Sequence, residues 1–386
     1  MMSVATQTTR ETKTETVVHT VPLQLETSQQ KNDTVRWVID EQQRTREWTA
    51  AHIVTFPSNE WGAKMGMYSR FKDTELKDSC DQLASNLQET IQKVATMFDS
   101  WASNGQRGHR PSFGDGSYCN IRSEYITIEA NDAGFGVNVR FEPYKDGVWW
   151  HIDASPYSNE YLERVVDDDD PASIGASELH LDEDGTLRLH LVVKWPVEVF
   201  KAGDVDRTLG VDLNVDPLVV GAVRDADGTI ENVTFESGSE FKHHRERLKR
   251  RRAEAQRVRR DQKVLWQEYT DHIANVASRR VVDIAAEHAP IVINMEDLTN
   301  YRDDASDPIH DWPYALIQEK IAYKATERGI PVRAVDPRYT SITCRQCGVT
   351  NKQSRSGRDF VCVNCGYEVH ADANAAMNIA AGGVSE

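Results

Sequence analysis

The pattern of apolar and polar residues predicts a mixed α/β region that begins at residue 207. Residues 208–235 contain three apolar runs separated by turn residues, as expected for three consecutive strands. The rest of this region alternates between helical and strand patterns: a helix at about 240–287, a strand at 289–298, a helix at 311–330, a strand at 331–337 and a final helix from about 372. Strands flanked by helices in this order indicate an α/β fold.

The first 206 residues have a different pattern. Residues 17–26 alternate as a strand does, and residues 118 to about 200 predict a series of strands that ends in a hairpin with Asp184-Gly185 at its turn. Between them lies an amphipathic helical pattern, followed by a Gly-rich loop at 104–117. The apolar face of that helix consists of Leu83, Leu87, Ile91, Val94, Met97 and Phe98. We therefore expect an all-β module that surrounds an inserted helical module.

The amino-acid composition indicates the cellular compartment and the salt environment of the protein. The chain has 386 residues, enough for two or three domains, and 61 acidic against 45 basic residues, a net charge of −16. Arg outnumbers Lys by 30 to 15, and an acidic, Lys-poor surface is typical of proteins from salt-loving archaea. No apolar run is long enough to span a membrane, and the Thr-rich start has no apolar signal core. We expect a cytoplasmic protein.

One segment reverses the acidic balance. Residues 241–263 carry eleven Lys and Arg against three acids, a net of +8. A charge run is commonly just a solvated face, but on so acidic a chain this concentration favours a nucleic-acid backbone as partner. Trp149, Trp150 and Trp312 offer rings that stack on bases, although core packing is the simpler interpretation. The basic residues that we expect to contact phosphates are Lys242, Arg245, Arg247, Lys249, Arg250, Arg251, Arg252, Arg257, Arg259 and Arg260.

Four of the six cysteines have the spacing of a metal site. Cys344, Cys347, Cys362 and Cys365 form two Cys-x2-Cys pairs that are separated by fourteen residues. Such pairs place four thiolates around one tetrahedral zinc ion in a closed, structural site. Disulfides are the alternative, which the absence of a secretion signal disfavours.

Three carboxylates stand out in the α/β region. Asp212 lies within an apolar strand, Glu296 ends another, and Asp372 begins the final helix. Each has a simple structural explanation: Asp212 pairs with an Arg, Glu296 is the first exposed residue after its strand, and Asp372 caps the helix. A buried charge is unfavourable unless it is paired or binds metal. Adjacent strands and a packed helix can bring all three together, where they can hold two Mg²⁺ ions that cleave phosphodiesters.

These segments together resemble a known family. The motifs GVDLNVDPLVVGAV, IVINMEDLTN, AVDPRYTSITCRQCG and CVNCGYEVHADANAAMNIA resemble the RuvC-like nuclease of the TnpB (OrfB) proteins of insertion sequences. The resemblance covers residues 207–386 closely and the first 206 more weakly. It implies that Asp212, Glu296 and Asp372 are the three catalytic acids of an RNase H-like fold with an inserted zinc ribbon. One departure is Asn214, where many members have Gly, and we expect it to crowd the loop.

The resemblance also implies a domain order and partners. We expect a β-barrel wedge domain interrupted by a helical recognition lobe, and then the nuclease. The partners implied are a guide RNA from the 3′ end of the element and a double-stranded DNA target, with Mg²⁺ (or Mn²⁺) for catalysis and no need for a protein oligomer. The expected divisions are a disordered tail (1–16), the first barrel strand (17–32), the helical lobe (33–104), the wedge barrel (105–206), the nuclease (207–339 and 369–386) and the zinc ribbon (340–368).

Three other functions stay open at this point. A nuclease-inactive, RNA-guided DNA-binding regulator requires loss of an acid, and all three positions are filled here. A transposase that joins strands without a guide RNA requires its own recognition of DNA ends, and the adjacent His243 and His244 lack the His-x-His spacing of Tyr transposases. A zinc-ribbon binding module without catalysis leaves Asp212 and Glu296 unexplained.

Overall fold

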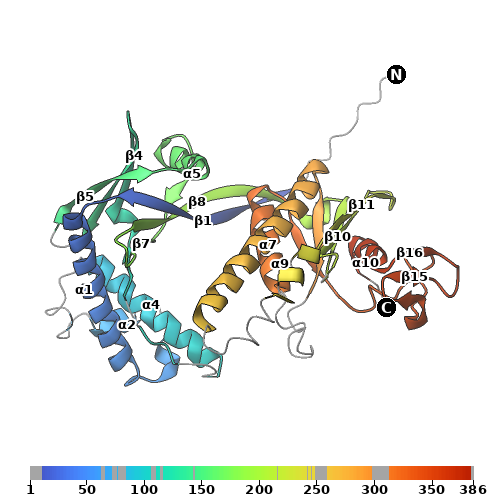
Figure 1. Cartoon of the computed structure of the whole chain (residues 1–386), viewed down its shortest axis with the longest axis horizontal. Coiled ribbons are helices and arrows are strands. Elements are labelled where there is room, and N and C mark those ends of the chain that lie inside the picture. The colour runs from blue at the N-terminus through green and yellow to red at the C-terminus, as the bar shows by residue number, and fades with distance from the viewer. Residues whose placement is uncertain are drawn as a thin grey trace. The chain divides into compact units, whose positions relative to one another are not determined.

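The computed structural model divides the chain into two compact units, residues 18–196 and residues 197–386 together with the start of the chain. Figure 1 gives the labels of the elements. No helix in the part of the chain described is long and apolar enough to cross a membrane. The residues described are 11–61, 66–71, 76, 84–105, 110–113, 116–141, 144–214, 216–240, 242–244, 246–247, 259–297 and 313–383.

The C-terminal unit is built on a five-stranded sheet with the order β11-β10-β9-β12-β13. Neighbours β9, β10 and β11 are antiparallel, whereas β12 pairs in parallel with both β9 and β13. The strands are β9 (Thr208–Leu213), β10 (Val219–Arg224), β11 (Ile230–Glu236), β12 (Val292–Glu296) and β13 (Val332–Val335). The α/β fold predicted for this region is confirmed in its strands and in the described parts of its helices, whereas residues 248–258 of the helix predicted at about 240–287 lie outside the described residues.

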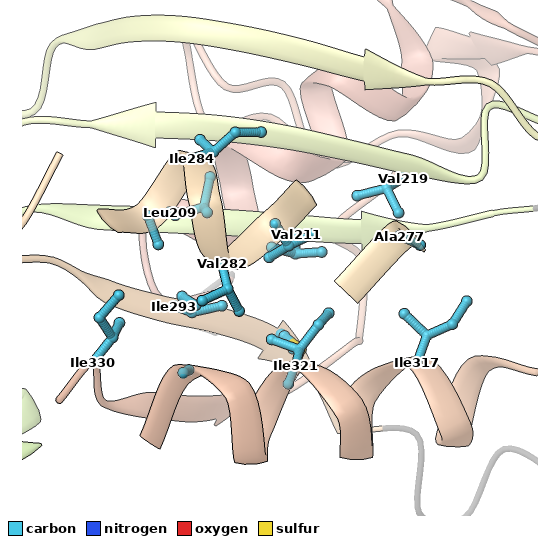
Figure 2. Packing of buried hydrophobic residues seen from close by; sticks show 14 of the residues in the cluster. Leu209, Val211, Val219, Ala277, Val282, Ile284, Ile293, Ile317, Ile321 and Ile330 are labelled. Carbon is cyan, nitrogen blue, oxygen red and sulfur yellow. The ribbon is translucent and has the colours of Figure 1, made fainter. Parts of the chain in front are cut away.

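Helices cover both faces of this sheet. Leu209 and Val211 of β9 face α7 (Arg259–Glu287) and α9 (Tyr314–Glu327), where they pack with Val282, Ile317 and other apolar side chains (Figure 2). The alternate positions of the strands face the last helix, α10 (Ala371–Ala380), in a second cluster that contains Val220, Ala222 and Ala376. Strand alternation thus assigns the intervening residues of β9, including Asp212, to the α10 side.

The helix α10 lies unusually close to the sheet. A methyl group on Gly210 would meet the Ala376 carbonyl oxygen at 2.1 Å, so only glycine fits at this position of β9. The Thr208 hydroxyl donates to the Ala380 carbonyl at 2.6 Å, and the Asn294 amide donates to the Ile379 carbonyl at 3.1 Å. These contacts fix the C-terminal end of α10 over the beginning of β9.

A small cysteine-containing ribbon lies between β13 and α10. Its three-stranded sheet consists of β14 (Arg355–Ser356), β15 (Asp359–Val361) and β16 (Glu368–His370), and η4 (Lys352–Ser354) precedes it. The strand β16 leads directly into α10, whose N-cap is His370. The chain therefore leaves the sheet after β13, folds as the ribbon and returns as α10, as expected from the sequence. The alternative role of Asp372 as N-cap is wrong, because the His370 side chain accepts the hydrogen bond from the Asp372 N–H.

The N-terminal unit contains an eight-stranded antiparallel sheet with helices. The main path of strands is β2-β7-β8-β1-β5-β4-β3, and β6 pairs with β8. These pairings form an open path among the described residues, so the predicted closed barrel is not established. The strands are β1 (Thr12–Glu26), β2 (Tyr118–Ile121), β3 (Ile126–Asn131), β4 (Gly134–Phe141), β5 (Tyr144–Asp153), β6 (Ser173–Ile174), β7 (Ser177–Leu181) and β8 (Leu187–Phe200). The helices are α1 (Gln29–Ile53), η1 (Ser58–Glu60), α2 (Gly66–Phe71), α4 (Ala84–Ser103), η2 (Ser123–Tyr125), α5 (Pro156–Val166) and η3 (Ala202–Asp204), of which η3 belongs to the C-terminal unit.

Three expectations for this half are corrected. The stretch predicted as strands contains the helix α5, which starts from a capping box at Ser155 and Ser158 with Pro156 in its first turn. Strand β1 begins at Thr12, so residues 12–16 are not a tail, because the Thr-Lys-Thr-Glu-Thr alternation continues the strand. Met97 is 45% exposed and does not belong to the apolar face of α4, whereas Phe98 is fully buried. The hairpin of β7 and β8 is confirmed, and Gly185 adopts a φ of 85° at its turn.

Candidate active site

The sheet register brings the three predicted carboxylates to one place. In the parallel pair of β12 and β9, Met295 lies opposite Val211, so Glu296 lies beside Asp212 on the α10 face. The Thr208–Ala380 contact marks one end of α10, and Asp372 lies about 12 Å back along the helix. Asp212 lies about 13 Å along β9 from Thr208, a matching distance. Asp372 therefore arrives at the same edge of the sheet as Asp212 and Glu296.

A polar partner holds each carboxylate. The Asn214 amide donates to Asp212 Oδ2 at 2.7 Å, and the Thr340 hydroxyl donates to Glu296 Oε1 at 2.6 Å. The Arg355 guanidinium, from β14 of the ribbon, binds Asp372 Oδ1 at 2.9 Å. Asn214 thus orients an acid, where the sequence predicted only a crowded loop.

The electrostatics favour a site that takes up positive charge. Burial, followed by the repulsion of Glu296, raises the pKa of Asp212 to about 7. Burial also raises the pKa of Glu296, while the Thr340 hydrogen bond and the charge of Arg355 act in the opposite direction. Asp212 is only 7% exposed. The simple explanation that it pairs with an Arg does not hold among the described residues, because its direct contact is with Asn214.

Asp212 and Glu296 border a cavity of about 310 Å³. Its lining is mostly polar and includes Asp212, Asn214, Glu296, Thr340, Arg355 and Tyr314, the first residue of α9. The donor atoms of the three carboxylates do not all lie within 4.8 Å of one another, which sets them apart from a compact single-ion site. The cavity has room for a polar ligand between the acids.

The four predicted cysteines form one cluster, with all four sulfur atoms within 4.8 Å of one another. The Sγ atoms of Cys344 and Cys365 are 3.7 Å apart, and those of Cys347 and Cys362 are 3.6 Å apart. Four sulfurs at about 2.3 Å from a tetrahedral ion have edges of about 3.8 Å, whereas a disulfide requires about 2.05 Å. Gly348 and Gly366 follow the pairs with φ values of 74° and 71°, a left-handed conformation that glycine adopts without strain. The disulfide alternative is wrong for these residues.

Two asparagines of α10 connect the ribbon to the acids. The Asn374 and Asn378 amides both donate to the Thr343 carbonyl, at 2.7 and 2.8 Å, and Asn378 also binds the Thr340 carbonyl at 2.8 Å. The Arg345 N–H donates to Asn374 Oδ1 at 3.0 Å. The segment that carries Thr340 is therefore fastened to the same helix that carries Asp372.

The predicted nucleic-acid-binding residues lie only partly in the described region. Lys242 and Arg247 are exposed, and Arg259 and Arg260 form the first turn of α7. Trp150 is buried and Trp149 is 45% exposed, so core packing is confirmed only for Trp150. The remaining predicted residues lie outside the described residues: Arg245, Lys249, Arg250, Arg251, Arg252, Arg257 and Trp312.

The sequence interpretation missed Thr340 and Arg355. Both lie between the strands and the final helix, in a stretch dominated by the cysteine pattern. Arg355 is seventeen residues from its partner Asp372, and only the fold of the ribbon brings them together. No spacing rule identifies such a residue, whereas the Asn214–Asp212 contact is local and was open to prediction.

Comparison with known proteins agrees with this geometry. Residues 314–379 match the family model "Cas12f1-like, TNB domain". A CRISPR-associated endodeoxyribonuclease Cas12f1 of Sulfoacidibacillus thermotolerans is 49% identical over 104 residues, 27% of this chain and 25% of the relative. A TnpB-like protein of Aquifex aeolicus is 31% identical over 133 residues, 31% of this chain and 44% of the relative. The predicted relationship to the TnpB family is confirmed.

Further relatives set the extent of this relationship. The putative RNA-guided DNA endonuclease InsQ of Escherichia coli is 28% identical to this chain over 221 residues, 49% of the chain and 54% of InsQ. The chain thus matches about half or less of the length of these curated relatives. A solved structure of CasPhi-2 (Cas12j) bound to crRNA shares the fold at a TM-score of 0.50 and 10% identity, and the alignment covers 94% of this chain and 97% of that one.

Proposed function

We propose that the chain is an RNA-guided, metal-dependent DNA endonuclease of an insertion sequence, with Asp212, Glu296 and Asp372 as its catalytic acids. The observation that carries the proposal is the convergence of these three carboxylates, from β9, β12 and α10, at one edge of the sheet, where Asp212 and Glu296 line a polar cavity. Relatives named as RNA-guided or CRISPR-associated DNA endonucleases support the same activity.

The donor set fits magnesium. Mg²⁺ prefers hard oxygen ligands, and no cationic side chain among the described residues directly contacts the buried Asp212 carboxylate, whose pKa is raised. Bound divalent ions would activate a water molecule and stabilise the leaving oxygen of the phosphodiester. Asn214 and Thr340 orient the oxygens of Asp212 and Glu296, and Arg355 fixes Asp372. Arg355 also lines the cavity, where it offers positive charge to a phosphate.

The thiol cluster fits zinc, and its role would be structural. Four thiolates leave no open position for substrate, so the ribbon acts through what it positions. It delivers Asp372 at the start of α10 and Arg355 from β14. The ribbon is thus an insertion that completes the acid site, which explains why cysteines precede the third acid so closely.

The domain order of the TnpB family supports separate functions for the different parts of the chain. In this proposal residues 207–339 and 369–386 form a RuvC-type nuclease, 340–368 the zinc ribbon, and the N-terminal half a wedge domain (17–32 and 105–206) with a helical recognition lobe (33–104). The basic residues 242–260 hold the backbone of a guide RNA or of the target DNA, and base pairing with the guide selects the DNA sequence.

The decisive experiment starts from the protein expressed with its native 3′ flank and purified in high salt. Sequencing of the copurified RNA identifies the guide, and a plasmid with the matching target then tests Mg²⁺-dependent cleavage. We expect Asp212→Asn to lower cleavage at least about a thousandfold, while binding of RNA and target DNA is kept. The matched control is Asp227→Asn, an exposed turn residue of the same unit, which should cut normally.

Each outcome separates the proposal from the other functions. A folded native protein without a specific RNA contradicts RNA guidance and leaves a nuclease or transposition accessory that reads DNA itself. Guided binding without cleavage by the native chain indicates a regulator instead. Loss of DNA binding in Asp212→Asn, in parallel with loss of cleavage, contradicts a purely catalytic role for this acid.

A further inference from the structure

A second group of metal-ligating side chains lies in the N-terminal unit, apart from both sites above. Glu178 and His180 of β7 and His190 of β8 each offer a donor atom, and these atoms all lie within 4.8 Å of one another. Among the described residues, only this group and the four cysteines meet that condition. Neither the family comparison nor the proposed nuclease chemistry gives these three residues a role.

Strand alternation and register bring the three side chains together. Leu179 and Leu189 are fully buried on one face of the hairpin, so Glu178, His180 and His190 share the other, half-exposed face. Glu178 lies directly opposite His190 in the antiparallel ladder, and His180 is two residues along the same strand. The arrangement therefore rests on a rigid two-stranded scaffold with a buried leucine layer beneath it.

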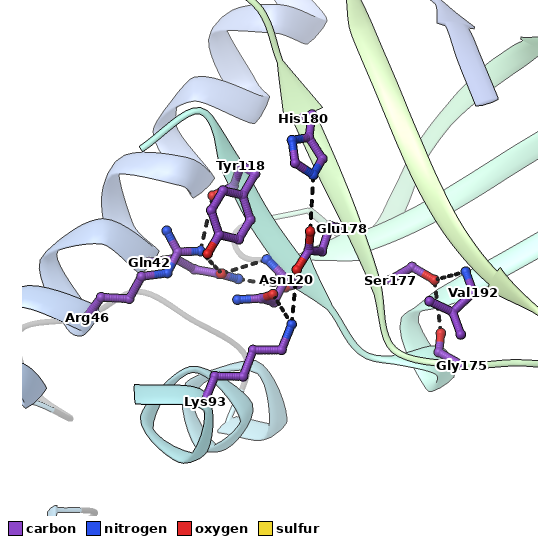
Figure 3. Close-up of polar contacts among 10 residues, drawn as sticks. All are labelled: Gln42, Arg46, Lys93, Tyr118, Asn120, Gly175, Ser177, Glu178, His180 and Val192. Atoms are coloured by element: carbon purple, nitrogen blue, oxygen red, sulfur yellow. Dashed lines mark hydrogen bonds and ion pairs between the residues drawn. The ribbon is translucent and has the colours of Figure 1, made fainter. Parts of the chain in front are cut away.

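The two imidazoles already turn toward each other and toward the carboxylate. The ring centroids of His180 and His190 are 4.2 Å apart, and His180 Nε2 lies 3.2 Å from Glu178 Oε2. The second oxygen, Glu178 Oε1, accepts a hydrogen bond from the Lys93 ammonium of α4 at 3.2 Å (Figure 3). The Lys93 hydrogen bond holds the carboxylate from one side, so its other oxygen, Oε2, faces the imidazoles in a fixed direction, as is typical of metal ligands with outer hydrogen bonds.

The surrounding charges leave the group suited to a cation. The neighbouring Arg188 forms an ion pair with Asp182, and Lys93 is bound to the far oxygen of Glu178.

We propose that Glu178, His180 and His190 bind a divalent transition-metal ion of the zinc class. Two imidazoles and one carboxylate are a donor set that zinc accepts, and the half-exposed face leaves the fourth position to water. The ion fastens β7 to β8 and, through Glu178 and Lys93, connects the hairpin to α4. The site is independent of the proposed nuclease activity and lies in the other unit.

Cobalt separates this site from the cysteine cluster. The tag-free full-length protein is stripped of metal, titrated with Co²⁺ and freed of unbound metal by gel filtration. Cobalt on thiolates gives intense charge-transfer absorption, whereas cobalt on imidazole and carboxylate gives only weak ligand-field bands. We expect one Co²⁺ ion per chain bound by imidazole and carboxylate, and we expect one equivalent of Zn²⁺ to displace it once the cysteines are filled with zinc.

Two variants assign the ion to these residues. His190→Gln and Glu178→Gln should each lose the thiolate-free ion and keep the thiolate-bound one, and an unchanged circular dichroism spectrum shows that the N-terminal unit of each variant is folded. The matched control His151→Gln changes a histidine of the same sheet, in β5, and should keep both. The proposal is overturned if the native chain binds cobalt only at the thiolates. It is also overturned if both variants still bind the thiolate-free ion.

Discussion

The five-stranded sheet of the C-terminal unit is covered by helices on both faces, whereas the β7–β8 hairpin of the N-terminal unit keeps one half-exposed face. The first sheet encloses Asp212 with little direct compensation, and burial raises its pKa to about 7. The second sheet carries Glu178 near the surface beside Lys93 and His180, and its pKa falls to about 2. Two carboxylates that both lie on β-strands thus have pKa values shifted in opposite directions.

The difference lies in what each fold provides for a charged group. On the half-exposed face, nearby cations and water satisfy the carboxylate, so its charge is stabilised without any ligand. On the covered face, α10 excludes water and brings in another acid, so the charge is unfavourable until a cation arrives. A fold that maintains such a cluster gives up stability, which is typical of sites kept for function. The predictions below test this contrast with paired substitutions in the two units.

The largest effect is expected from the cysteine cluster. Cys362→Ser should remove the zinc ion, unfold the ribbon and abolish cleavage, because the ribbon delivers Asp372 and Arg355 to the site. Zinc content and cleavage of the target are the measurements. Cys119→Ser, a buried cysteine of the other unit, should leave the zinc content unchanged. A folded Cys362→Ser protein that cleaves normally refutes the positioning role of the ribbon.

The next largest effect concerns the close approach of α10. Gly210→Ala would press a methyl group against the Ala376 carbonyl and the Ala380 N–H, both within 2.2 Å, so α10 must move. We expect a loss of about 3 kcal/mol in unfolding free energy and a severe loss of cleavage. Gly136→Ala, a strand glycine of the other sheet with no contact closer than 3.6 Å, should change stability little. Equal losses in a denaturant titration of the two variants would contradict the asymmetry.

The parts of this molecule that sequence predicts well are those with local causes. The strands of the five-stranded sheet, the cysteine knuckles and the assembly of Asp212, Glu296 and Asp372 follow from alternation, spacing and family motifs. Helix α5 was missed because Val148, Trp150 and Ile152 upstream read as strand, and the Ser155 capping box was outweighed. The start of β1 was missed because polar Thr alternation without apolar partners looks like a tail.

Contacts made across the fold could not be predicted. Arg355 reaches Asp372 only because three short strands turn the ribbon back on itself, and Thr340 reaches Glu296 only because α10 holds its segment. The cluster of Glu178, His180 and His190 was open to prediction, because the hairpin and its turn were recognised. Once the turn of a hairpin is known, counting residues from it gives the pairs that lie opposite each other. The three polar residues on one face were nevertheless not recognised as metal ligands, because the cysteine and acid motifs gave stronger signals.

A smaller effect is expected from the hydrogen bond that orients Glu296. Thr340→Val keeps the shape of the side chain and removes the donor that binds Glu296 Oε1. Loss of such an outer contact typically lowers metal affinity or activity about ten- to a hundredfold. The measurement is the cleavage rate as a function of Mg²⁺ concentration, and higher Mg²⁺ should recover part of the loss. Thr127→Val, on an exposed position of β3, is the control, and a matching decrease in it would exclude a specific role for Thr340.

The smallest effect concerns Lys324 of α9, which lies in the covered helix layer of the five-stranded sheet. Burial, followed by the charges of Arg279 and Lys320, lowers its pKa to about 8, although its ammonium donates to Asn275 and Ser278. The ammonium is therefore less favourable in the folded protein than in the unfolded chain, whose Lys pKa is about 10.5. Between pH 8 and 10.5 the unfolded chain binds more protons, so this group adds stability as the pH rises.

The melting temperature of the native protein, relative to that of Lys324→Met, should therefore rise by a few degrees between pH 8 and 10.5. The reason is that the variant has no amine to titrate at this position. The difference between two proteins cancels the titrations that they share. Lys194→Met in β8 of the other unit is the control for a general effect of removing a lysine. A flat difference for Lys324→Met would mean that its three hydrogen bonds compensate fully for burial, and the contrast between the two units would then be limited to their carboxylates.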